Sequence, residues 1–133
     1  MTKDKLEKYK KLKLELKTIE EELDYLREKK TSIKTQIIND MPTITQTEVD
    51  MLGELLSKID KTIRLYMTKY KKILKNLYKI ESSINQLNEL ERTVIRYVYF
   101  EDKKFEEVSC IIKYSYRTIR RIHKSAIDKL EAS

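Results

Sequence analysis

The feature that most restricts the fold of this chain is its lack of turn-forming residues, with one Gly and one Pro among 133 residues. Strand-rich and α/β chains need frequent turns, and proteins contain on average about 7% Gly and 5% Pro. The chain is therefore predicted to be all-α, with few connections. A composition of 38% charged and 40% hydrophobic residues suits amphipathic helices. At this length, one domain or a small domain with an extension is expected.

Two long heptad patterns fill the first two thirds of the chain. The first runs from Tyr9 to Ile37 in alternating steps of three and four, with one polar interruption at Lys30. Asn39, Asp40 and the only Pro then end the helix. Thr45-Gln46-Thr47-Glu48 matches a capping box and starts a second helix. Its apolar positions are Val49, Leu52, Leu56, Ile59, Ile63, Tyr66, Tyr70, Ile73, Leu77, Ile80, Ile84 and Leu87.

Residues 1–87 are predicted to form a long antiparallel helical hairpin of coiled-coil type, because short connections make neighbouring helices antiparallel. A turn centred at about residue 43 would place Leu12 opposite Leu74. The same apolar stripes could instead build an intermolecular coiled coil, and a homodimer through the heptad helices stays open.

Lysines follow the outer face of the second helix, and no acidic residue occurs between Lys61 and Ile80. A solvated helix face is the simpler interpretation. The alternative is a track of phosphate contacts. Its candidates are Lys72, Lys75 and Lys79.

Residues 88–133 are predicted to be a second domain of three short helices, at about 90–100, 105–112 and 117–130. The last two are a short helix and a longer one joined by a tight turn, which is the plan of a helix-turn-helix. Ser115 is placed to cap the third helix. The second helix is predicted to present Phe105, Val108, Ile111 and Ile112 inward. Cys110 is expected to be a small core residue of the same helix, since free Cys is among the most buried residue types.

The third helix has a basic outer face, and no acidic residue occurs from Val108 to Ile127. Arg can read guanine in the major groove, and Lys, Ser and Tyr can hold phosphates or meet base edges. The net charge of +7 agrees with an anionic partner. The predicted contacts to double-stranded DNA are Lys113, Ser115, Tyr116, Arg117, Arg120, Arg121 and Lys124.

Residues 105–130, FEEVSCIIKYSYRTIRRIHKSAIDKL, resemble region 4 of bacterial sigma-70 factors, whose helix-turn-helix reads the −35 promoter element. The resemblance implies DNA contacts from the start of the third helix and a contact with RNA polymerase. Arg117 and Arg121 replace a usual acidic residue and a usual Gln, so a different base preference is implied. The buried positions that it implies are Phe105, Val108, Ile112, Tyr114, Ile119, Ile122, Ala126 and Leu130.

The hairpin has no counterpart of the helices with which a sigma factor melts DNA, so a stand-alone sigma factor is not expected. The whole plan is similar to small regulators of phages and prophages of Gram-positive bacteria, related to the ArpU and RinA groups. That resemblance implies a sequence-specific DNA-binding regulator of transcription, an activator of phage late genes, in the cytoplasm of the bacterial host.

Two further classes stay open: a DNA-packaging protein like a phage small terminase, and a coiled-coil adaptor that docks on RNA polymerase. An enzyme is not expected, because the sequence has no Gly-rich phosphate loop, metal-ligand cluster or nucleophile with a base. No cofactor, metal or membrane is expected as a partner. His123, the only His, is expected at the surface or on a phosphate rather than in catalysis.

Overall fold

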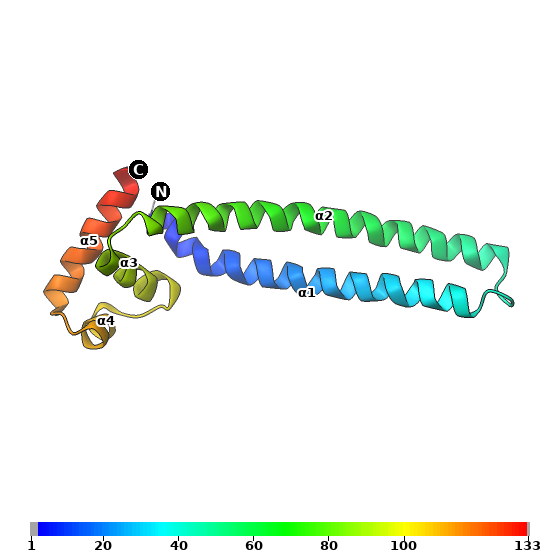
Figure 1. Ribbon diagram of the computed structural model, residues 1–133, viewed down its shortest axis with the longest axis horizontal. Coiled ribbons are helices and arrows are strands. Elements are labelled where there is room, and N and C mark those ends of the chain that lie inside the picture. Colours follow the sequence, from blue (N-terminus) through cyan, green and yellow to red (C-terminus); the bar gives the residue numbers. More distant parts are fainter. Residues whose placement is uncertain (1–2, 133) are drawn as a thin grey trace. The chain divides into compact units, whose positions relative to one another are not determined.

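The computed structural model describes residues 3–132, and these contain helices and no strand (Figure 1). This confirms the all-α fold class. None of the helices between residues 3 and 132 is long and apolar enough to cross a bilayer. In chain order the elements are α1 (Lys3–Asn39), α2 (Gln46–Asn85), α3 (Glu89–Ile95), the π-helical turn η1 (Arg96–Phe100), α4 (Phe105–Ile112) and α5 (Tyr116–Ala132).

The chain divides into two compact units, and neither ends at residue 87. The hairpin unit comprises residues 15–73, and the terminal unit comprises residues 3–14 together with residues 74–132. The start of α1 and the end of α2 thus pack with the C-terminal helices. The division into domains 1–87 and 88–133 stays a prediction about which parts fold on their own.

In the hairpin unit, residues 15–39 of α1 and 46–73 of α2 run antiparallel, joined by a short loop (Figure 1). The predicted capping box is present, because the Glu48 amide donates to Thr45 Oγ1 at 3.2 Å and the Thr45 amide donates to Glu48 Oε2 at 3.3 Å. Lys30, the polar interruption of the first heptad pattern, forms an ion pair with Asp60 at 2.6 Å.

The register of the two helices differs from the prediction. Lys30 pairs with Asp60 and Glu20 accepts a hydrogen bond from Tyr70, so both pairs are centred on residue 45 rather than 43. Opposite positions are therefore displaced by about one helical turn. The loop is asymmetric about its centre. The backbone amides of Thr43 and Ile44 both donate hydrogen bonds to the Asp40 carbonyl, and the first turn of α2 extends past the end of α1.

The terminal unit has its own core. The helix α5 packs on both α3 and α4. Val94, Val108 and Ile119, one from each of these helices, are fully buried together, with the aromatic ring of Phe105 against them. This confirms the predicted three-helix packing.

The start of α1 also contributes to this unit. The Tyr9 ring stacks on Phe100 with centroids 3.7 Å apart, and its hydroxyl donates to Glu81 at 2.5 Å. Arg96 reaches the other oxygen of Glu81 at 2.8 Å. In the register predicted from the sequence Tyr9 would lie one turn away from Glu81, so this contact was not anticipated.

The π-helical turn changes which side chains of the first block face inward. The Glu101 amide bonds the Arg96 carbonyl five residues earlier, at 3.1 Å. This wider turn places Tyr99 in the core together with Val94 and Ile95. Tyr99 is therefore available to contact α5.

Candidate nucleic-acid interface

The turn between α4 and α5 is held by local hydrogen bonds. Lys113 ends α4 in the left-handed conformation, with φ 61° and ψ 37°. The Ser109 hydroxyl donates to the Tyr114 carbonyl. Ser115 Oγ accepts from the Thr118 amide at 3.2 Å, which confirms Ser115 as the predicted cap of α5. These contacts set the direction in which α5 leaves the turn.

Three predicted contact residues lie in or next to this turn, and all are exposed: Lys113, Ser115 and Tyr116. The Ser115 hydroxyl is already used in the cap and also bonds Thr118 Oγ1 at 2.8 Å. The Tyr116 ring is in edge contact with Phe105, and the Arg120 guanidinium lies 5.8 Å from its centroid. Tyr116 is thus oriented at the start of α5.

Four of the five Lys and Arg residues of α5 share its outer face, because positions three, four and seven apart project from the same side of a helix. These residues are Arg117, Arg120, Arg121 and Lys124. All four are exposed, and none forms an ion pair with a carboxylate within residues 3–132. The structure therefore places the α5 part of the predicted site on one surface, whose basic side chains form no described ion pair.

The three candidates for the predicted phosphate track lie on α2, on either side of the division between the two units. Lys72 belongs to the hairpin unit, whereas Lys75 and Lys79 belong to the terminal unit. All three are exposed. Lys79 lines an open hollow of about 590 Å³, shared with Lys5 and Lys8 of α1. Their role as phosphate contacts stays a prediction.

Three predictions of burial were wrong. Ile111 and Tyr114 are each 45% exposed, and Cys110 is exposed as well. The two-turn helix α4 packs through a narrow face around Val108 and Ile112, mainly against α5 and η1. Cys110 lies about 200° around the helix from Val108, which places it on the solvent side.

The position of His123 also differs from a plain surface site. It is half-buried, and its Nε2 shares a hydrogen bond of 2.7 Å with the Tyr99 hydroxyl. The Phe105 ring contacts it edge-on with centroids 5.0 Å apart. Burial, together with the positive charge of Lys3, lowers the pKa of His123 below its usual value, so the imidazole is neutral at neutral pH.

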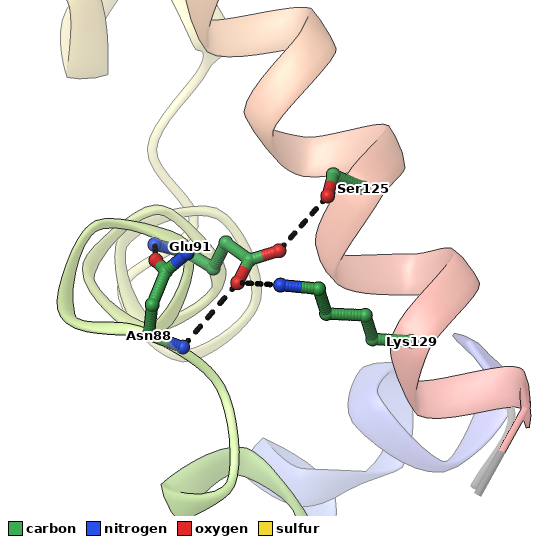
Figure 2. A network of polar contacts seen from close by, with 4 residues as sticks. All are labelled: Asn88, Glu91, Ser125 and Lys129. Carbon is green, nitrogen blue, oxygen red and sulfur yellow. Dashed lines mark hydrogen bonds and ion pairs between the residues drawn. The ribbon is translucent and has the colours of Figure 1, made fainter.

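The sequence reasoning missed one buried polar network, centred on Glu91 of α3 (Figure 2). The Glu91 carboxylate accepts hydrogen bonds from Lys129 at 2.7 Å and Ser125 at 3.0 Å, both on α5. It also accepts a hydrogen bond from the backbone amide of Asn88, while Asn88 Oδ1 accepts one from the backbone amide of Glu91 at 2.9 Å. This is a capping box, and Asn three residues before Glu was its signal in the sequence.

This network predicts a loss of stability in acid. Burial disfavours the charged form of Glu91, but the hydrogen bonds that the carboxylate accepts outweigh it and hold the pKa below the usual 4.5. A lowered folded-state pKa stabilises the fold above about pH 4.5, and that contribution disappears as the pH falls through the folded-state value. The stability advantage of the natural protein over Glu91→Gln should therefore shrink from pH 5 downward in urea unfolding. A constant advantage between pH 7 and pH 3 would contradict it.

The comparisons with known proteins support the same module. Residues 83–132 match the family model of sigma-70, region 4. No curated protein and no solved structure matches the chain. The C-terminal part is thus a helix-turn-helix of the sigma-70 region 4 type, which is a DNA-binding domain and not a catalytic one. Within residues 3–132, no cluster of three side chains suited to a metal ion occurs.

Proposed function

We propose that this protein is a sequence-specific double-stranded DNA-binding regulator of transcription. The observation that carries the proposal is the outer face of α5, where three arginines and a lysine are exposed without a described carboxylate partner, on a module of the sigma-70 region 4 type. A helix-turn-helix places its second helix in the major groove, with the N-terminal residues against base edges. The exposed start of α5 suits that role.

The side chains divide by chemistry. Arg117, Arg120 and Arg121 can donate two hydrogen bonds to guanine O6 and N7. Lys113 and Lys124 carry point charges suited to phosphates. Tyr116 presents an aromatic edge and a hydroxyl at the first turn of α5. Base contacts would supply specificity, and phosphate contacts would position the helix.

The finer role follows from the resemblance of the whole plan to ArpU- and RinA-related regulators. On that basis the protein acts on phage or prophage late genes, and its operator differs from the −35 element because of Arg117 and Arg121. Footprinting on the DNA upstream of the neighbouring genes tests this assignment.

Substitution of the arginines tests the interface. Arg120→Ala and Arg121→Ala should each weaken binding to the cognate duplex by about 1–3 kcal/mol, since a base-reading arginine contributes about that much. Arg64→Ala is the matched control, because it removes an exposed arginine from α2 in the hairpin unit. Fluorescence anisotropy with specific and scrambled duplexes measures both affinity and discrimination. Unchanged binding in both α5 variants would overturn the assignment of the site.

RNA polymerase is the second candidate partner, which the family match and the exposed apolar side chains Ile111 and Tyr114 favour. Capture of purified polymerase by a protein that has no measurable affinity for DNA would decide for an adaptor. A homodimer through the heptad helices is the third proposed partner. Leu55 and Leu65 of α2 support it, because both are exposed apolar residues of the hairpin unit.

A further inference from the structure

A basic hollow lies beside the proposed recognition surface, within the terminal unit. Its volume is about 460 Å³, and no carboxylate lines it. Its lining residues are Lys3, Phe105, Arg120, Arg121, His123 and Lys124. The start of α1 therefore supplies a cation to a surface that otherwise belongs to α4 and α5.

Four cationic side chains converge on this hollow without a described ion pair to offset their repulsion. The ion pairs that occur within residues 3–132 involve other lysines and Arg96. Like charges held close together in a partly enclosed space attract a counter-ion, and arginine forks match the oxygens of a phosphate. The hollow thus has the electrostatics of an anion site.

The aromatic part of the hollow is fixed by packing. Phe105 packs against the buried core, and His123 is held by the Tyr99 hydroxyl. The charged and titratable groups around the imidazole are Lys3 of α1, the arginines and lysine of α5, and Tyr99, which itself feels the charge of Glu7. The pKa of His123 is therefore a local reporter of any anion that enters.

We propose that this hollow is a phosphate-binding site in which Lys3 and Lys124 hold a phosphate of the DNA backbone beside the base-reading Arg120 and Arg121, so that the start of α1 takes part in holding the duplex. The inference rests on the proposed function, because the same α5 residues would face the duplex. A backbone phosphate suits the site better than an enclosed effector, since the hollow is open to solvent and adjoins the groove-reading face.

The DNA arm of the test compares Lys3→Gln with Lys11→Gln. Lys11 is an exposed lysine of α1 in the same unit that does not line the hollow. Loss of one phosphate contact should lower the slope of log affinity against log salt by about 0.9, which corresponds to about fivefold weaker binding at 0.15 M salt. Because phosphate contacts are independent of sequence, the ratio of specific to scrambled binding should stay unchanged. An equal slope for the natural protein, Lys3→Gln and Lys11→Gln would overturn the backbone contact.

The second arm needs no DNA binding. The pKa of His123 is measured by NMR with and without inorganic phosphate, and again with a short duplex. An anion in the hollow should raise this pKa, and the increase should be smaller in Lys3→Gln than in Lys11→Gln. An increase with both probes supports a backbone phosphate, whereas an increase with inorganic phosphate alone assigns the site to free phosphate. No increase with either probe would overturn the phosphate site.

The two arms separate this inference from the proposed function. If the protein binds the duplex, the salt slope is unchanged in Lys3→Gln and phosphate does not raise the pKa of His123, then the proposed function stands and the phosphate site in the hollow is refuted. If the protein has no affinity for any duplex but inorganic phosphate raises the pKa of His123, then the proposed function is refuted and the hollow remains a site for free phosphate.

Discussion

Replacing Ile119 with alanine is expected to destabilise the terminal unit by about 2–5 kcal/mol, the usual cost of truncating a fully buried isoleucine. Ile119 is 0% exposed and packs against Val94 of α3 and Val108 of α4. It is also the core residue that lies among the arginines of α5. A cavity at this position would therefore weaken the packing of α5, which carries the proposed interface, against α3 and α4. Urea unfolding followed by circular dichroism measures the loss.

The chain offers a matched control for this substitution. Ile111→Ala removes the same atoms from α4, but Ile111 is 45% exposed. A surface substitution of this kind should change the unfolding free energy by no more than about 0.5 kcal/mol. Equal losses in the two variants would show that Ile119 is not part of the core that the structure places around it.

Replacing Glu91 with alanine is expected to cost about 2–4 kcal/mol. The substitution removes a capping interaction worth about 1 kcal/mol and charge-assisted hydrogen bonds worth about 1.5–3 kcal/mol. Glu91 is 3% exposed, whereas the Lys129 side chain is 54% exposed and can be solvated when its partner is gone. The total therefore falls short of that for a fully buried ion pair. Thermal and urea unfolding of the variant test this value.

Glu89→Ala is the control for Glu91→Ala. Glu89 is also an acidic residue in the first turn of α3, but it is exposed and its side chain makes no described contact. Its removal should cost only the interaction with the helix dipole, about 0.3–1 kcal/mol. If Glu89→Ala destabilises the protein as much as Glu91→Ala, the contacts to α5 contribute nothing measurable.

Much of the fold follows from local patterns. The predicted ends of the two long helices agree with the structure, because Asn39 ends α1 and the Thr45 capping box starts α2. The apolar positions of both heptad patterns are buried or half-buried. Heptad spacing and helix capping involve residues only a few positions apart, so both can be recognised from the sequence alone.

The candidate site was predicted in the same way, and only in part. Helical spacing was enough to place Arg117, Arg120 and Arg121 on one exposed face. It was not enough for α4, where Cys110 and Ile111 are exposed. The apolar residues of this short helix lie around more of its circumference than the neighbouring helices bury.

By itself, the sequence determined a helical chain with a long hairpin and a C-terminal helix-turn-helix whose last helix is basic on its outer face. Only the tertiary structure decided the hairpin register, the burial of Glu91 and the position of Lys3 beside the arginines of α5. Each of these depends on contacts between residues dozens of positions apart. Such contacts depend on how a loop turns and how helices pack, and the periodicity of a single helix contains neither.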